Sequence, residues 1–146
     1  MCQLCGIKDI ATQGRWPKAL EPSIKDLDFL VEIAHDDYQT NKSACSSKDT
    51  IPHSLLDALR LLASALDQLD TDREIWWSSP EKRELRKRLD LECDQKKLTE
   101  LHKINNAAKD RTEAMQARLG TFVKWSLGMN GGIWELVEGE KVKTEK

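Results

Sequence analysis

A regular row of leucines constrains the fold of this chain more than any other feature of its sequence. The leucines recur every three or four residues, so they lie along one side of an α-helix. Ala58, Leu61 and Ala65 widen this apolar side, which is typical of a central bundle helix with neighbours on both flanks. The members of the row are Leu55, Leu59, Leu62, Leu66 and Leu69.

The charges within this segment decide whether it lies in water or in a membrane. A cap at Asp49 or Thr50 favours a helix from Ile51 to Leu69, with Pro52 in its first turn. Its eight Leu and Ile residues favour insertion by roughly 4 kcal/mol. Its three charges oppose insertion by roughly 5–10 kcal/mol, so we expect the helix to pack in water. These charges are Asp57, Arg60 and Asp67.

A second helix is predicted before the leucine row. Pro22 precedes it, and its apolar residues keep helical spacing from Ser23 to about Thr40. The polar stretch 41–50 then predicts a connecting loop, because its side chains bury little apolar area. The apolar residues of this helix are Ile24, Leu27, Leu30, Val31, Ala34 and Tyr38.

The C-terminal half predicts one long helix. Ser79 is a suitable cap and Pro80 suits the first position, while Gly128, Gly131 and Gly132 predict the end. Heptad spacing continues through this segment at Leu98, Leu101, Ala108, Met115, Leu119 and Phe122, with polar interruptions at Asn105 and Thr112. Gly120 is a candidate point of weakness, and a short last helix is expected at Ile133–Val137.

The composition agrees with a single helical domain. Charged residues make up 33% of the chain and aromatic residues 5%, a balance that favours solvated helices over β-sandwiches. We therefore predict an all-α bundle of about four helices over residues 1–137, followed by a flexible charged tail at 138–146. The net charge of −2 gives no overall attraction to nucleic acid or anionic lipid.

The N-terminus and the cysteines indicate the compartment. Residues 1–9 show no basic segment followed by an apolar run, so we expect no secretory signal. Four cysteines are too few and too scattered to staple a chain of this length, and we interpret them as thiols. We expect a cytoplasmic protein, with peripheral membrane contact as the alternative.

No group of residues in the sequence predicts an active site. Cys2 and Cys5 have a spacing that suits a metal or a redox pair, but four ligands at zinc spacing are not found. We interpret these two cysteines as small apolar residues at a helix start. The histidines His35, His53 and His102 are far apart. We therefore expect no catalytic residue, no metal and no cofactor, and a protein that is not an enzyme.

A cluster of five cations lies at the start of the long helix. Such a cluster suits phosphate groups of lipid or nucleic acid. Acidic residues interleave with it, however, and Glu84–Arg88 and Glu92–Lys96 are favourable helical pairs, so an ordinary solvated face is the preferred interpretation. The candidate anion or lipid contacts are Lys82, Arg83, Arg86, Lys87 and Arg88.

Tryptophan is frequent for so small a domain, with five residues against one tyrosine. Trp76 and Trp77 lie at a helix junction, while Trp125 and Trp134 flank the glycine-rich segment. Because one indole buries about 150–250 Å², we expect these side chains to close the ends of the bundle. Exposed tryptophans would instead indicate a partner or membrane surface.

Two segments resemble the HeLo domain, the helical N-terminal domain of fungal heterokaryon-incompatibility and prion-associated cell-death proteins. The first is similar to the family's "L-x-x-D-I-A … R-x-x-R-W-G-x-A", and the second to its "K-W-A-L-x-D-x-x-x-F-x-x-L-I". The residues that carry the resemblance are Asp9, Ile10, Ala11, Arg15 and Trp16 in the first segment and Lys124, Trp125, Leu127 and Leu136 in the second.

The resemblance implies a helical scaffold that self-associates or regulates in fungal cell death, without enzymatic activity. The sequence departs from the family at Pro17, where a glycine is usual, and at Met129 and Asn130, where an acidic residue is expected. Family members begin with an apolar, membrane-inserting helix, and we expect this chain to lack it. No C-terminal amyloid-forming repeat is recognisable either.

Two other functions fit the sequence. One is an adaptor that pairs with a protein through a coiled-coil face formed by Leu98, Leu101, Met115, Leu119 and Phe122. The other is a surface binder that uses the basic cluster. A protein partner or a second copy is the expected ligand, nucleic acid is disfavoured, and no small-molecule substrate is expected.

Overall fold

The computed structural model describes residues 3–13, 15–42 and 51–129. In these residues the chain forms α-helices and one short 3-10 turn without any strand, so the predicted all-α bundle is confirmed. The elements are α1 (Gln3–Thr12), η1 (Lys18–Leu20), α2 (Glu21–Thr40), α3 (His53–Ser78), α4 (Pro80–Leu91) and α5 (Gln95–Leu127).

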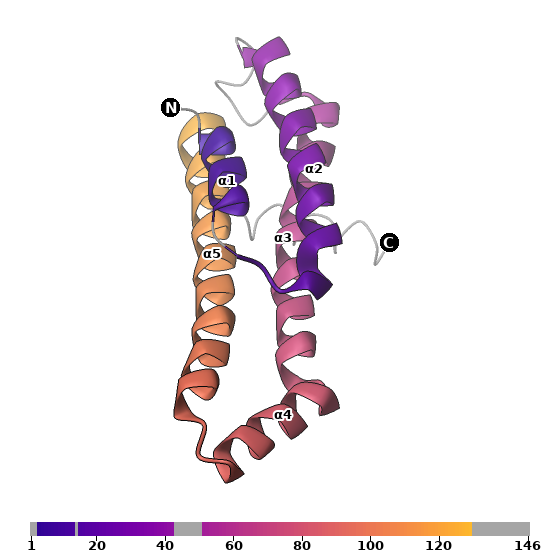
Figure 1. Ribbon diagram of the computed structural model, residues 1–146. Coiled ribbons are helices and arrows are strands. Elements are labelled where there is room, and N and C mark those ends of the chain that lie inside the picture. The colour runs from indigo at the N-terminus through magenta and orange to yellow at the C-terminus, as the bar shows by residue number, and fades with distance from the viewer. Residues whose placement is uncertain (1–2, 14, 43–50, 130–146) are drawn as a thin grey trace.

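Two long antiparallel helices, α3 and α5, form the frame of the molecule (Figure 1). Helix α2 packs chiefly on α3, while α1 packs chiefly on α5 and also contacts α2. Helices α1 and α2 lie along the upper part of this pair in Figure 1, and α4 joins α3 to α5 at the lower end. The core therefore lies where α1 and α2 cover the α3–α5 pair.

The leucine row of α3 is the centre of this core. All five predicted members are buried, with exposed fractions of 1% or less. Burying one such side chain stabilises the fold by about 1.5–3 kcal/mol. The row packs against side chains from α1, α2 and α5, including Ile7, Val31 and Phe122. Tyr38 of α2 also contacts Phe122 edge-on, with 5.0 Å between ring centroids.

The observed α3 differs from its prediction at both ends. It begins at His53 rather than Ile51, because Pro52 has an extended conformation and precedes the first turn. It continues nine residues past Leu69 to Ser78. The helix ends there because a residue before proline avoids the helical conformation, and Ser79 has ψ 149° before Pro80. The caps suggested at Asp49 or Thr50 lie outside the described residues.

The long C-terminal helix is divided, which corrects its prediction. Ser79 caps α4 as expected, since its Oγ accepts a hydrogen bond from the backbone N–H of Lys82 at 3.3 Å. The chain leaves the helix after Leu91, and Cys93 has a φ of 57°. Asp94 then caps α5 by accepting from the N–H of Lys97 at 3.2 Å.

Helix α1 forms near the N-terminus, where Cys2 and Cys5 indicate a helix start, and brings the described α-helices to five. Leu4, Ile7 and Ala11 of α1 are buried against the core. Lys8 contacts α2, because its Nζ donates to Glu32 at 2.9 Å and lies 3.7 Å from an Asp28 oxygen. The hydrogen bond with Glu32 and the charge of Asp28 raise the pKa of Lys8.

Of the glycines and helix ends predicted from the sequence, some agree with the structure and others differ. Helix α5 passes through Gly120 without interruption. Gly128 ends it with a φ of 70°, a conformation that glycine adopts without strain. Helix α2 starts two residues earlier than predicted, with Pro22 in its first turn. The expected helix Ile133–Val137, the boundary at residue 137 and the tail 138–146 lie outside the described residues.

Adjacent leucines of α3 give a direct test of the core. Leu62 is fully buried, whereas Leu61, predicted as part of the apolar side, is 56% exposed. We expect Leu62→Ala to lower the free energy of unfolding by about 2–5 kcal/mol. Leu61→Ala should change it by less than about 0.5 kcal/mol. Urea unfolding followed by circular dichroism measures both, and equal losses would contradict this packing.

Candidate interaction surface

Helix α4 is held at the lower end of the molecule by contacts with two tryptophans. The Arg86 guanidinium lies over the Trp77 ring at 4.0 Å from the centroid, and its Nη1 donates to the Trp77 carbonyl oxygen at 2.6 Å. His102 of α5 meets the Trp77 ring edge-on, with 5.0 Å between the ring centroids. Lys82 lies 5.4 Å from the Trp76 centroid. Cation–π contacts therefore help to hold α4 against the end of α3.

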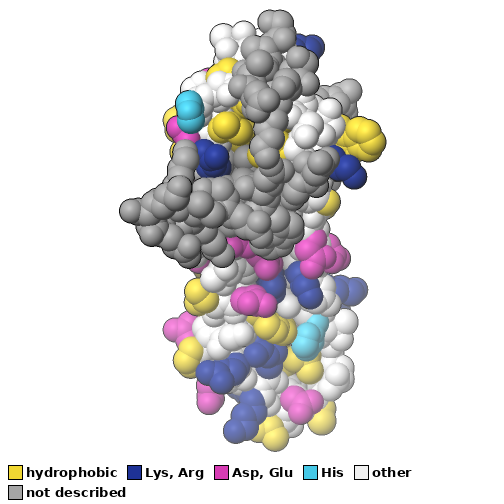
Figure 2. Space-filling model, turned by 180° about the vertical axis from the view of Figure 1, so that it is seen from behind, with side chains coloured by type: hydrophobic (Ala, Val, Ile, Leu, Met, Phe, Trp, Pro, Cys, Tyr) yellow, Lys and Arg dark blue, Asp and Glu magenta, His cyan; other side chains and the backbone are white. Residues whose placement is uncertain are grey.

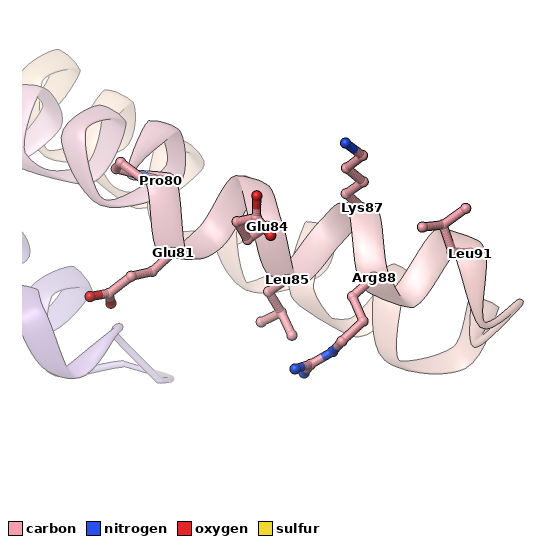
Figure 3. A pocket seen from close by; sticks show the side chains of 7 residues that line it. All are labelled: Pro80, Glu81, Glu84, Leu85, Lys87, Arg88 and Leu91. Carbon is pink, nitrogen blue, oxygen red and sulfur yellow. The ribbon is translucent and has the colours of Figure 1, made fainter.

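These contacts divide the five predicted anion-binding residues into two groups. Lys82 and Arg86 are half-buried over tryptophan rings, whereas Arg83, Lys87 and Arg88 are exposed. The helical positions place Lys82, Arg83, Arg86 and Lys87 on one side, which we call the basic face of α4. Arg88 lies on the other side. Figure 3 shows Lys87 and Arg88 pointing in opposite directions.

The side of α4 that carries Arg88 is mixed in charge, and Lys87 lies at its border with the basic face. It forms an open depression that combines two carboxylates and two cations with exposed apolar groups. The predicted pairs Glu84–Arg88 and Glu92–Lys96 are not among the ion pairs within 4.0 Å in the described part of the chain. The depression is lined by Pro80, Glu81, Glu84, Leu85, Lys87, Arg88 and Leu91 (Figure 3).

The predicted coiled-coil face of α5 does not form a free surface, which corrects that prediction. Met115, Leu119 and Phe122 are buried in the core because α1, α2 and α3 pack over this part of α5. Leu98 and Leu101 are half-buried further down the helix. Leu101 lines a shallow depression between α4 and α5. These apolar residues therefore pack against other helices of the same chain rather than against a partner.

The two polar interruptions of that row have partners on α3. Arg73 is only 3% exposed, and its Nη1 donates to the Asn105 side-chain oxygen at 2.8 Å. Its Nε donates to Asp70 at 3.1 Å. The Thr112 hydroxyl lies 3.1 Å from the same Asp70 oxygen and 2.8 Å from the Lys109 carbonyl oxygen, and these two oxygens share its single proton. We call Asp70, Arg73, Asn105 and Thr112 the polar clamp.

The first HeLo-like segment contacts α5. The Trp16 indole donates to the Ala11 carbonyl oxygen at 2.7 Å. Arg111 of α5 lies 5.2 Å from the Trp16 ring centroid, and its Nη1 donates to the Arg15 carbonyl oxygen at 2.6 Å. Ala11 is buried, Ile10 and Trp16 are half-buried, and Asp9 and Arg15 are exposed.

The second HeLo-like segment is mostly at the surface. Leu127 is buried, but Lys124 is exposed and Trp125 is 77% exposed, with the Lys124 ammonium 5.5 Å from its ring centroid. The expectation that tryptophans close the bundle holds for Trp16, Trp76 and Trp77, and it is wrong for Trp125. Leu136 and Trp134 lie outside the described residues.

The candidate metal ligands remain apart. No group of three His, Cys, Asp or Glu side chains that could hold a metal occurs in the described residues. Cys5 is half-buried in α1 and Cys93 is exposed between α4 and α5. Cys2 lies outside the described residues. His35 is 3.9 Å from Asp36 at the surface of α2.

Charge is segregated between the helices, a feature that the net charge of −2 conceals. Helix α2 has six carboxylates and one lysine, and α3 has five carboxylates and two arginines, so their formal charges are −5 and −3. Helix α4 has five cations and three carboxylates, and α5 has seven and three, giving +2 and +4. Figure 2 shows the Lys and Arg side chains near the α4 end intermixed with acidic and hydrophobic groups.

The comparisons with known proteins identify no relative of this chain. The chain matches no protein-family model, no curated protein and no solved structure. Among the described helices, none combines the length and the apolar content needed to cross a bilayer.

The polar clamp can be tested with a double-mutant cycle. Asn105→Leu leaves the buried Arg73 without one acceptor, and we expect it to lower the free energy of unfolding by about 1–3 kcal/mol. Arg73→Met should have a loss of similar size. The double variant should lose less than the sum, because it removes both partners and leaves no unsatisfied group between the helices. Strictly additive losses in urea unfolding would contradict the pairing.

Proposed function

We propose that this chain is a non-enzymatic helical domain that self-associates, in the manner implied by its resemblance to the HeLo domains of fungal cell-death proteins. The observation that carries the proposal is the segregation of charge, with −8 on α2 and α3 together and +6 on α4 and α5 together. Each copy therefore offers helices of net acidic and of net basic charge to another copy.

Electrostatics favours association for a chain charged in this way. A net charge of −2 causes little repulsion between whole molecules. Opposite surfaces attract each other once they approach within the Debye length, which is about 8 Å at physiological ionic strength. Complementary potentials of this kind increase the association rate and select the orientation of the partner. The proposal thus predicts weak, salt-sensitive self-association.

The second candidate is binding to an anionic surface through α4. The observation that favours it is the exposure of Arg83, Lys87 and Arg88 on a single short helix. Three carboxylates on the same helix reduce its charge to +2, however, and each basic residue near a membrane surface contributes only about 1 kcal/mol. Self-association also uses the acidic helices, so it accounts for more of the charge pattern.

Sedimentation velocity tests self-association. At about 0.05 M NaCl we expect the average mass to rise above 16.7 kDa as the protein concentration increases. Raising the salt to about 0.5 M should return it to the monomer value, because the charges are then screened within a few ångströms. A mass of 16.7 kDa at every concentration and at low salt would contradict the proposal.

Vesicles distinguish the second candidate. Because α4 has a charge of only +2, we expect the protein to remain in the supernatant with both neutral and phosphatidylserine-containing vesicles at physiological salt. We also expect no release of an encapsulated dye. Binding that depends on phosphatidylserine and is lost on adding salt would favour the surface binder, and dye release would show a membrane activity that self-association does not explain.

A further inference from the structure

We infer that the basic face of α4 in one copy docks on the outer face of α2 in a second copy of this chain. The inference rests on the proposed self-association and names the two surfaces that meet. These surfaces belong to different parts of the molecule, because α4 lies beyond the lower end of α2 (Figure 1). They are therefore free to meet in two copies.

The outer face of α2 is acidic around one exposed aromatic ring. Phe29 is 63% exposed, the largest apolar side chain that α2 leaves in solvent. Asp36 lies two turns further along nearly the same line, and Asp26 lies one turn before it. Both carboxylates are exposed. Lys8 contacts Glu32 and Asp28 rather than Asp26 or Asp36. Asp36 lies 3.9 Å from a ring nitrogen of His35.

The basic face of α4 has the complementary chemistry. Arg83 and Lys87 are exposed and one turn apart, so they lie about 6 Å apart along the helix axis. Asp26 and Asp36 lie about 15 Å apart along α2, with Phe29 between them. A helix of twelve residues, about 18 Å long, covers this stretch.

Phe29 gives the contact an anchor that charge alone does not supply. Guanidinium and ammonium groups bind aromatic faces, and this chain already uses that contact at Trp16, Trp76 and Trp77. Arg83 is the exposed guanidinium of the basic face and is therefore the group placed to cover Phe29. Lys87 then faces a carboxylate of the same α2.

A charge-swap experiment tests this docking in the intact chain by sedimentation velocity at low salt. The first variant, Arg83→Glu with Lys87→Glu, reverses the basic face, and the second, Asp26→Lys with Asp36→Lys, reverses the α2 face. Each variant alone should self-associate about tenfold more weakly than the parent chain. An equimolar mixture of the two should recover association to within about threefold of the parent, because each reversed surface then finds its complement.

Matched controls separate the position of a charge from its amount. Arg88→Glu with Lys103→Glu makes the same change in net charge as the first variant, at exposed positions outside the basic face. Asp110→Lys with Glu113→Lys makes the same change in net charge as the second variant, at exposed positions of α5. Both controls should keep association within about threefold of the parent. Phe29→Ala should weaken it, with an unchanged circular dichroism spectrum.

The outcomes distinguish this inference from the proposed function. A parent chain that stays monomeric overturns both. A parent that associates while the two variants behave as their controls, or a mixture that fails to recover, overturns the α4–α2 docking alone. Loss of binding to phosphatidylserine vesicles in the first variant, with unchanged self-association, would assign the basic face to a membrane and also overturn the docking.

Discussion

The buried Arg73 is the constraint on which the rest of the structure depends. Arg73 is only 3% exposed, and a buried guanidinium is costly to desolvate unless its donors find acceptors; here Asp70 and Asn105 accept from it. Because Asn105 belongs to α5, sliding one helix along the other would leave the Arg73 Nη1 donor without its acceptor. The polar clamp therefore sets the register of α3 against α5 below the leucine core, where α1 and α2 no longer help to hold them.

Much of the fold could be predicted from local spacing. The leucine row of α3 and the Ser79-Pro80 start of α4 are strong signals, because burial and capping act over a few residues. Leu61 was misplaced, since its exposure depends on which neighbours α3 has, and spacing alone does not give them. The break after Leu91 was missed because neither glycine nor proline marks it. The only local signal was Asp94, a capping residue three positions before Lys97.

The candidate surface was only partly visible in the sequence. The five cations at 82–88 stood out as a run, but which of them are exposed depends on Trp76 and Trp77, which lie on another helix. The negative charge on the outer face of α2 is hard to predict from the sequence, because its carboxylates are spread over twenty residues and the net charge of the chain hides them. The heptad residues Met115, Leu119 and Phe122 suggested a partner, yet an intramolecular helix pair satisfies the same pattern.

The clamp and the surface are connected through α4. Its two ends join α3 and α5, so fixing the register of these helices also fixes where α4 sits. The Arg86–Trp77 contact then sets its orientation and keeps Arg83 and Lys87 facing outward. A surface held in this way loses little conformational freedom on binding, which allows a modest number of exposed charges to give measurable affinity. In the proposed self-association the buried charge therefore acts indirectly, because it positions the helix that docks.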